Sequence, residues 1–466
     1  MSDPRTPERP FDPNWLLEPG WAPSRRSILR GAAALGAPIV LGAGAGAQES
    51  APEELEEEAA SDLPPLKVGI VGCGGRGTGA AWQAMHAENG SVVLHAMGDL
   101  FEDRLEGSAS TLEQMLAEEG NEARMDVPSE RRFTGFDAYQ KVMDAGIDVV
   151  LLTTPPGFRP AHLEHAVRKG LHIFCEKPVA VDVPGALRAA RASLEAQAKG
   201  LSLVSGFCWR YNLRHRAFFE RLHGGAIGDI QAVYTNYYTG PLGSRERQPE
   251  WTDVEWQLRN WHHFRWISGD HIVEQACHSI DKQSWAFKDE APRRAIALGG
   301  CQTRTGTEKG NTWDNFGVVY EYGENARAFM MARQWPNSYG ENNDYFYGSL
   351  GTATIENWTP LHRIQGPGSW TWEYEGEGND MYQQEHDELF ASIRAGEPIS
   401  DGQWMTRSTL LALMGREAAY SGRAVEWEEL LTLGAPEAPV GMDTGILQMG
   451  SLAYAPEPVP GRYELG

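Results

Sequence analysis

The sequence predicts an α/β domain followed by an α+β domain, and three observations support this prediction. Apolar, strand-like runs alternate with helical patterns through the first half of the chain, which is typical of a parallel sheet covered by helices. A glycine-rich turn directly follows the first of these runs. Further along, segments of alternating polarity at 316–322, 326–334 and 352–357 are joined by Gly-rich turns and are predicted to be strands of a second sheet.

The composition favours a globular protein with a small, neutral ligand. The 466 residues allow two domains of ordinary size, and a hydrophobic content of 41% with 16 Trp supports sizeable cores. The formal net charge of -23 disfavours nucleic acid or an anionic membrane as a partner, because no basic cluster outside the N-terminus offsets it. Five cysteines lack CxxC spacing, so we expect buried thiols and neither disulfides nor metal ligands at Cys73, Cys175, Cys208, Cys277 and Cys301.

The N-terminus carries the pattern of an export signal. Residues 24–30 read SRRSILR, an apolar Gly/Ala-rich stretch follows at 31–41, and 45–47 form a small-residue cleavage site. This order is typical of a twin-arginine signal, so we expect removal of residues 1–47 on export to the periplasm and an acidic linker over 48–65. The apolar stretch is too short and too diluted to span a membrane, so we expect no stable membrane association after signal removal. Because this pathway is understood to carry folded proteins, we expect any cofactor to be bound beforehand and retained.

A glycine motif predicts a dinucleotide site in the first domain. Gly72, Gly74 and Gly77 form GxGxxG directly after the apolar strand at 66–71. The first glycine allows a tight turn, the second allows backbone to approach a pyrophosphate, and the third allows close packing of the next helix. The N-terminal amides of that helix would face the phosphates, so we predict a Rossmann domain over residues 66–184.

An acidic residue ends the next strand of this domain. Asp99 follows the apolar run at 92–97 and lies 27 residues after Gly72, where it is placed to bind the adenosine ribose hydroxyls. A carboxylate would repel a ribose phosphate, so NAD is favoured over NADP as the cofactor. Arg76 and Arg104 leave that choice open.

Two later strands end in residues suited to a ligand site. The apolar strand at 148–152 runs into the polar turn TTPP, which contains Thr154 and Pro155, and His162 follows near the start of the next helix. The strand that begins at Leu171 ends in Glu176, Lys177 and Pro178. Open α/β sheets bind their ligands at the carboxyl ends of strands, so we expect these residues to meet the cofactor.

Lys177 is the first candidate for proton chemistry. Charge is costly in a partly desolvated cleft, so we expect its pKa to be lowered towards the range of a general acid or base. Taken alone, the alternative that Lys177 is the solvated end of a strand stays open.

A second group of candidate catalytic residues lies within 269–285, where the sequence pattern predicts one amphipathic helix. Glu274, His278 and Asp281 share one stripe of this helix at 100° per residue, opposite an apolar face. A carboxylate four residues before a histidine can orient its ring, and histidine is suited to accept a hydroxyl proton near pH 7. An ordinary helix with a solvated polar face is the alternative.

Tryptophans recur every five residues just before this helix, at 251, 256, 261 and 266, with His262, His263 and Arg265 between them. Flat rings stack on sugars, so a carbohydrate lid is one interpretation, and a buried aromatic cluster is the other. A spacing of five matches neither helix nor strand, so the sequence does not orient these residues.

These motifs resemble a known family. The GxGxxG turn, the TTPP turn followed by His162, and the CEKP element at 175–178 are similar to those of the glucose-fructose oxidoreductase, inositol dehydrogenase and MocA (Gfo/Idh/MocA) family. The resemblance implies a C-terminal domain with a large, mostly antiparallel sheet, opened by the turn at 224–230. It also implies that Lys177 assists proton transfer beside the nicotinamide. The family carries Asp, His and Asp where this chain has Glu274, His278 and Asp281, so Glu274 is a departure that puts the substrate in doubt.

We therefore predict an exported, NAD-dependent oxidoreductase that acts on a sugar or polyol and retains its cofactor. Domain 185–434 would bind substrate and join subunits into a homo-oligomer, and 435–466 would form a tail. Alternatives are an NAD-assisted glycosidase or lyase with no net redox change and a non-catalytic sugar-binding protein. In the enzyme, His278 would exchange the hydroxyl proton, Lys177 would support it electrostatically, and no metal is expected. The catalytic residues would be Lys177, His278 and Glu274; the cofactor contacts Gly72, Gly74, Gly75, Arg76, Gly77, Asp99, Thr154, Pro155, His162, Glu176 and Lys177; and the substrate contacts Arg210, Tyr211, Asp281 and Trp261.

Overall fold

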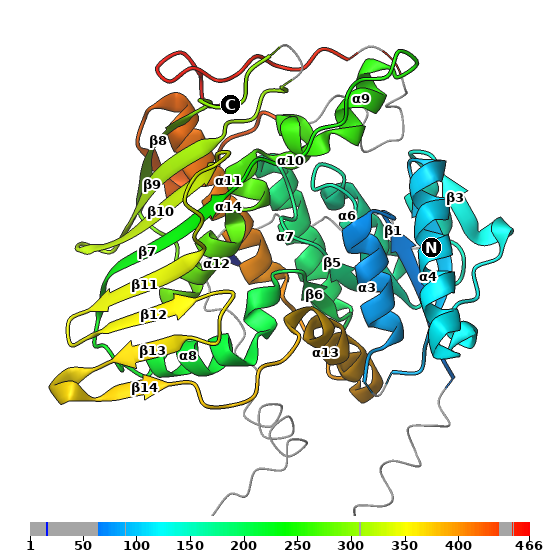
Figure 1. Ribbon diagram of the computed structural model, residues 1–466, viewed down its shortest axis with the longest axis horizontal. Helices are drawn as coiled ribbons and strands as arrows, with labels where there is room; N and C mark the ends of the chain where they lie inside the picture. The colour runs from blue at the N-terminus through cyan, green and yellow to red at the C-terminus, as the bar shows by residue number, and fades with distance from the viewer. Residues whose placement is uncertain (1–14, 17–63, 89, 307–308, 438–449, 451) are drawn as a thin grey trace, which may run out of the picture.

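The computed structural model describes residues 15–16, 64–88, 90–306, 309–437, 450 and 452–466. The predicted twin-arginine motif and cleavage site lie outside these residues, as does most of the predicted acidic linker. Figure 1 shows two sheets lying side by side, with helices between them and around the smaller sheet.

The smaller sheet is parallel and has the strand order β3-β2-β1-β4-β5-β6. Its central strand β4 is apolar and wholly buried, as expected for a parallel sheet with helices on both faces. The order changes direction between β1 and β4, which is where such sheets bind their ligands. The strands are β1 (Leu66–Val71), β2 (Val92–Asp99), β3 (Arg132–Thr134), β4 (Val149–Leu152), β5 (His172–Cys175) and β6 (Leu203–Ser205).

The parallel sheet extends beyond residue 184, the domain boundary that we expected from the sequence. Helix α7 (Val183–Ala198) crosses over and returns the chain as the sixth strand, β6. A helix from late in the sequence, α13 (Met381–Ala395), also packs on α3 of this domain. The other helices around this sheet are α3 (Gly75–Met85), α4 (Glu102–Glu119), α5 (Ala138–Met143) and α6 (Arg159–Lys169).

The larger sheet is mostly antiparallel, which confirms the predicted fold of the second domain. Its order is β14-β13-β12-β11-β7-β10-β9-β8-β15, and within it only the pair β7 and β10 is parallel. The strands are β7 (Ile230–Thr239), β8 (Arg294–Gly300), β9 (Asn315–Tyr322), β10 (Ala326–Gln334), β11 (Asn343–Gly348), β12 (Thr352–Glu356), β13 (His362–Gln365), β14 (Thr371–Glu373) and β15 (Val425–Glu426).

Among the described residues, helices cover one face of the larger sheet and none covers the other face (Figure 1). Helix α14 (Gly402–Ser421) is buried along its whole length, because it packs against α7 on one side and against β8 and β9 on the other. Helices α8 (Leu213–His223) and α12 (Cys277–Ala286) cover the rest of the same face. The two sheets therefore share one core, in which α14 and α7 are the central layer (Figure 1).

The helix predicted over 269–285 is interrupted in the structure. It forms α11 (His271–Glu274) and α12, with Gln275 and Ala276 between them. A contact from the parallel sheet lies at this interruption: the Lys177 ammonium donates to the backbone carbonyl of Glu274 at 2.5 Å. In a continuous helix that carbonyl would accept from the amide of His278, which instead donates to Gln275.

The remaining segments connect these layers. Helices α9 (Asp253–Arg259) and α10 (Arg265–Ser268) and the short turn η5 (Trp261–His263) lie beside the parallel sheet, and α15 (Trp427–Leu430) follows β15. All five cysteines are free thiols, and four of them are buried. In the part of the chain that the structure describes, no helix is both long and apolar enough to cross a membrane.

Candidate active site

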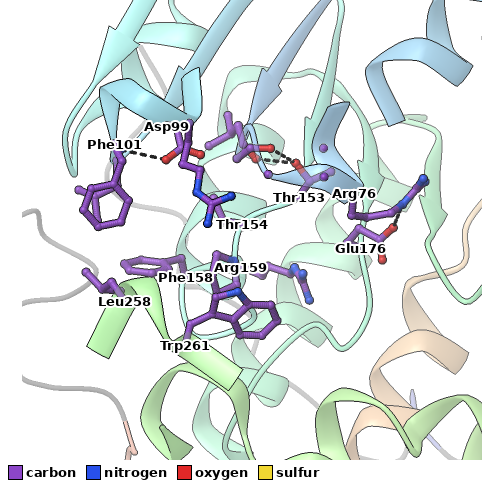
Figure 2. A pocket seen from close by; sticks show the side chains of 18 of the residues that line it. Arg76, Asp99, Phe101, Thr153, Thr154, Phe158, Arg159, Glu176, Leu258 and Trp261 are labelled. Carbon is purple, nitrogen blue, oxygen red and sulfur yellow. Dashed lines mark hydrogen bonds and ion pairs between the residues drawn. The ribbon is translucent and has the colours of Figure 1, made fainter. Parts of the chain in front are cut away.

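A cavity of about 790 Å³ runs along the carboxyl edge of the parallel sheet. One wall is the glycine-rich turn together with the ends of β2, β4 and β5, and residues from the second domain close the opposite side (Figure 2). The cavity is continuous from Asp99 at one end to Lys177, Glu274 and His278 at the other. The same cavity thus borders both the predicted ribose site and the predicted catalytic residues.

The glycine turn has the form of a phosphate cradle. A Cβ atom at Gly77 would lie 1.9 Å from the carbonyl oxygen of Gly72, and Gly72 itself has φ +103°. A Cβ at Gly74 or Gly75 would meet nothing within 4 Å, so the backbone at these two positions borders open space. No side chain caps the start of α3, which leaves its first amides free for an anion. These features fit the pyrophosphate of a dinucleotide.

Asp99 lines the cavity at the predicted ribose end. Its carboxylate accepts hydrogen bonds from the backbone amides of Cys73 at 2.7 Å and Phe101 at 2.9 Å, and Figure 2 shows the second of these bonds. Burial raises the pKa of Asp99, although these amides and the nearby Arg104 oppose the shift. The two amides fix the orientation of the carboxylate, which keeps further lone pairs for a ribose hydroxyl.

Arg76 and Glu176 connect the glycine turn to the lysine strand. Arg76 donates from Nε to the Glu176 carboxylate at 2.5 Å, as Figure 2 shows, and Glu176 accepts from the backbone amide of Lys177 at 3.0 Å. Both side chains line the cavity, as do Thr154 and Pro155. Their ion pair therefore fixes the position of Lys177 relative to the phosphate cradle.

His162 also lines the cavity, from the first turns of α6. Its ring lies 3.2 Å from the Thr154 hydroxyl and stacks on Tyr139. Burial lowers the pKa of His162 to about 3, so the ring is neutral and acts as a hydrogen-bonding partner.

Lys177 keeps its charge, contrary to the lowered pKa expected from the sequence. Burial is the largest single effect and lowers the pKa, but the Glu274 carboxylate, 3.2 Å from the lysine ammonium, acts together with Cys277, Glu176 and Tyr237 to raise the pKa overall. The same ion pair lowers the pKa of Glu274. Lys177 is therefore a cation that can stabilise negative charge on a substrate oxygen, and it is not a base at neutral pH.

His278 lies in the first turn of α12 and lines the same end of the cavity. Its Nδ1 atom is buried without a hydrogen-bond partner, and its ring packs edge-on against Phe207. Burial, together with the charges of Lys177 and Lys282, lowers the pKa of His278 well below 6.5. The ring is therefore neutral at physiological pH and can accept a proton.

His262, which we did not include among the predicted site residues, also faces this end of the cavity. It lies in η5, its Nε2 atom is 4.0 Å from the Glu274 carboxylate, and its ring stacks on Trp261 at 3.6 Å between centroids. Trp261 lines the cavity as well. The repeated Trp and His pattern pointed to this segment, but its irregular spacing could not show which rings face inwards.

Three predicted substrate contacts lie elsewhere. Arg210 is buried between Asp281 and Asp289, with its nitrogens 2.8 Å and 2.6 Å from these carboxylates, and Ser408 donates to Asp281. The hydroxyl of Tyr211 donates to Asp401 at 2.6 Å. The cavity lining does not include Arg210, Tyr211 or Asp281. Their ion pairs and hydrogen bonds instead connect α12 to neighbouring elements.

Residues 240–264, here called the closing segment, form part of the cavity wall, and they include Trp261 and His262 near Lys177. Arg259 donates two hydrogen bonds to Asp103 of α4, at 3.0 Å and 3.2 Å, and its guanidinium lies over the ring of Phe101. Apolar residues of this segment share a small core with loops of the parallel-sheet domain and with Leu452 and Tyr454. The described part of the C-terminal tail thus packs on its own chain, where Gln257 donates to the carbonyl of Leu452.

Comparisons with known proteins agree with this geometry. Residues 66–204 match the sequence model of GFO_IDH_MocA, described as an oxidoreductase family with an NAD-binding Rossmann fold. Inositol 2-dehydrogenase 4 of Saccharopolyspora erythraea is 29% identical over 164 residues, 35% of this chain and 42% of that protein. The 2,7-anhydro-N-acetylneuraminate hydratase of Escherichia coli is 22% identical over 213 residues, 45% of this chain and 52% of the hydratase. The chain thus spans about half the length of these curated relatives.

The likeness in fold extends over most of the chain. The crystal structure of aldose-aldose oxidoreductase from Caulobacter crescentus, complexed with glycerol, superposes with a TM-score of 0.61 at 19% identity. This match covers 78% of the present chain and 100% of that chain. At this identity it shows that both domains share a fold with that protein.

Proposed function

Because the chain belongs to the Gfo/Idh/MocA family of NAD-binding oxidoreductases, we propose that it oxidises a hydroxyl group, or reduces the ketone, of a sugar or polyol. The observation that carries this proposal is the meeting of Lys177, Glu274 and His278 at one end of a cavity whose other end is a dinucleotide cradle. The curated relative named inositol 2-dehydrogenase supports the choice of substrate class.

In the proposed reaction, NAD supplies the acceptor for a hydride. The glycine turn and the start of α3 would hold its pyrophosphate, and Asp99 would hold its ribose. Nδ1 of His278 is buried, so Nε2 is the ring atom left to accept the substrate hydroxyl proton as the hydride leaves the same carbon. The Lys177 ammonium stabilises the negative charge that develops on the substrate oxygen, and Glu274 keeps that ammonium charged and oriented.

A panel of sugars and polyols tests this proposal directly. The purified protein, supplied with NAD, is mixed with each compound, and the absorbance of NADH at 340 nm is followed. We expect at least one member of the panel to reduce the cofactor and the corresponding ketone to reoxidise it. If the protein binds NAD but none of the compounds reduces the bound NAD, the proposal is contradicted.

The pH dependence of this reaction follows from the two shifted groups. His278 must be neutral to accept a proton, and its pKa lies below 6.5, so its protonation stops the reaction only in acid. Lys177 must be charged, and its pKa lies above 10.5. We therefore expect the rate constant for reduction of bound NAD to be constant from pH 6.5 to 10.5. An acid limb centred at or above pH 6.5 in rapid-mixing experiments would contradict this assignment of the base.

We further propose that the protein retains its cofactor between turnovers, and the closing segment supports this. Arg259→Ala removes the ion pair with Asp103 and the contact with Phe101, so we expect NAD to dissociate about tenfold faster. The measurement is the loss of NAD from the holoprotein after transfer into cofactor-free buffer. Arg247→Ala is the control, because Arg247 lies in the same segment but pairs with Asp253 of that segment. Equal release rates in the two variants would contradict the role of Arg259.

We propose, from the sequence alone, that the protein is exported by the twin-arginine pathway. Changing both Arg25 and Arg26 to lysine should keep the protein in the cytoplasm, as measured by cell fractionation. Periplasmic protein in this double variant would contradict the proposal.

We also propose a homo-oligomer formed through the open face of the larger sheet. Apolar residues of this face alternate with core residues along the strands, and Ile296, Leu298 and Tyr347 are exposed at 41%, 72% and 46%. An apolar face of this kind is suited to a second copy of the same face. Leu298→Glu should therefore lower the molar mass measured by light scattering.

A further inference from the structure

The wall of the cavity is rich in cations, although the protein as a whole is acidic. Six of the residues that line the cavity are Arg or Lys and three are Asp or Glu, whereas the chain carries a formal net charge of -23. The cations are Arg76, Arg104, Arg159, Lys177, Arg245 and Arg259, and the carboxylates are Asp99, Glu176 and Glu274. This excess of positive charge makes the cavity suited to anionic ligands.

Arg159 is the cation that lies beside the proposed catalytic lysine and away from the phosphate cradle. It begins α6, and its Nη1 atom donates to the backbone carbonyl of Pro178, the residue directly after Lys177, at 2.5 Å. Figure 2 shows its side chain among those that border the cavity. Only 4% of Arg159 is exposed, and its Nε atom is buried without a hydrogen-bond partner among the described residues. Arg159 thus brings a buried guanidinium with an unused donor to the Lys177 end.

No carboxylate among the described residues forms an ion pair with Arg159. The two carboxylates that attract it, Glu176 and Glu274, already pair with Arg76 at 2.5 Å and with Lys177 at 3.2 Å. Burial lowers the pKa of Arg159, and the acidic groups around it do not offset this shift. A guanidinium nevertheless stays charged at neutral pH. This end of the cavity therefore contains a buried positive charge that the described protein groups do not neutralise.

A buried charge without a counterion is costly, and a ligand that supplies the counterion removes that cost. We propose that Arg159 binds the carboxylate of an acidic sugar, which makes sugar acids, such as uronic acids, the substrate class of this site. The planar guanidinium matches the two oxygens of a carboxylate. This inference rests on the proposed function, in which Lys177 and His278 act on a hydroxyl group of the same sugar.

The charge at this end of the cavity favours a carboxylate over a phosphate. A carboxylate carries one negative charge, which equals the charge of Arg159, whereas a sugar phosphate carries about -1.5 to -2 near pH 7. The surplus charge of a phosphate would be buried beside Glu176 and Glu274. The overall charge of -23 repels anions at long range, but salt screens that repulsion over about 8 Å. Charges within the cavity therefore decide which ligand is preferred.

Matched pairs of sugars test this inference. Glucuronate, galacturonate and mannuronate are compared with glucose, galactose and mannose, which carry a neutral CH₂OH group in place of the carboxylate, and glucose 6-phosphate represents the phosphates. Binding of each compound to the NAD-loaded protein is measured by calorimetry, and NADH formation is followed by absorbance. We expect at least one acid to bind about tenfold or more tightly than its neutral counterpart and to reduce NAD with a higher kcat/KM.

Variants at Arg159 show whether this residue causes the preference. Arg159→Gln removes the charge but keeps an N–H group that can donate to the carbonyl of Pro178. It should weaken binding of the preferred acid by about 10²-fold or more and change binding of the neutral sugar by less than about threefold. Arg159→Lys keeps the charge without the planar guanidinium, so it should weaken binding of the acid by about tenfold.

Arg168→Gln is the matched control for these variants. Arg168 lies in the same helix, its side chain is 54% exposed, and it pairs with Glu164 outside the cavity wall. It should change the binding of neither the acid nor the neutral sugar. NAD content and the unfolding temperature show whether Arg159→Gln folds, and Arg159→Lys replaces it if it does not.

The outcomes distinguish this inference from the proposed function. Equal weakening of the acid and the neutral sugar in a folded Arg159 variant shows that Arg159 only supports the chain at Pro178, and it overturns the inference. A wild type that prefers none of the three acids, or that binds glucose 6-phosphate more tightly than glucuronate, also overturns it. These results leave the oxidoreductase proposal intact. An acid that binds through Arg159, in a protein whose NAD no compound reduces, overturns the proposed function alone.

Discussion

Replacement of Lys177 by methionine is expected to slow the reduction of bound NAD by about 10²- to 10³-fold, which is the usual cost of removing one stabiliser of an oxyanion. Methionine has a similar length but no charge, so the variant loses the ammonium that we propose stabilises the substrate oxygen. It also leaves the Glu274 carboxylate, 13% exposed, without its cation. Rapid mixing with a substrate sugar measures the rate, and NAD released on denaturation shows whether the cofactor site survives.

The same variant should move the acid limb of the pH profile. The Lys177 charge is one of the causes that lower the pKa of His278, so its removal raises that pKa towards 6.5. The rate should then begin to fall at a higher pH than in the wild type. Lys169→Met is the control, because Lys169 is an exposed lysine at the end of α6 that pairs with Asp144 outside the cavity. Similar rates in both variants would show that Lys177 does not stabilise the reacting oxygen.

Replacement of Gly77 by alanine should abolish stable NAD binding. The new Cβ would lie 1.9 Å from the carbonyl oxygen of Gly72, so the turn and the start of α3 have to separate, and the phosphate cradle is lost. We expect the dissociation constant for NAD, measured by calorimetry on the apoprotein, to rise by about 10²-fold or more, the equivalent of about 2.7 kcal/mol.

Substitutions at two other glycines distinguish loss of the phosphate cradle from loss of the folded structure. Gly107→Ala lies within α4, where the added Cβ meets nothing within 4 Å, and it should leave NAD binding unchanged. Gly74→Ala also meets no protein atom, but it projects into the space for the phosphates, so it should weaken NAD binding without lowering the unfolding temperature. Tight binding in Gly74→Ala would contradict the placement of the pyrophosphate.

The cofactor half could be predicted from the sequence because its signals are local. The glycine turn, Asp99 and the CEKP element each follow directly from a strand, and the carboxyl ends of neighbouring parallel strands meet at one edge. The sixth strand was not included in this domain, because β6 is short and comes after a long crossover helix.

The catalytic helix shows where a local pattern stops being sufficient. Glu274 and His278 do meet at the cavity, but Asp281 faces Arg210 on the other side. The break before α12 does not explain this difference, because His278 and Asp281 both lie in α12. The partners of Asp281 are Arg210 and Ser408, which come from distant parts of the chain that a local pattern does not include. The predicted direction of the Lys177 pKa shift was wrong for the same reason. Burial of Lys177 could be inferred from its strand, but its partner Glu274 belongs to the other domain.

The closing segment has a consequence for steady-state kinetics. Under the proposed retention of the cofactor, a dinucleotide bound behind residues 240–264 would stay in place when the first product leaves, so the donor and the acceptor would enter one after the other. Double-reciprocal plots at several acceptor concentrations should then be parallel, and each substrate should inhibit competitively against the other. A protein that retains its cofactor in this way would need no dissolved nucleotide, and the rate of its cycle would depend on the two carbohydrates that its surroundings supply.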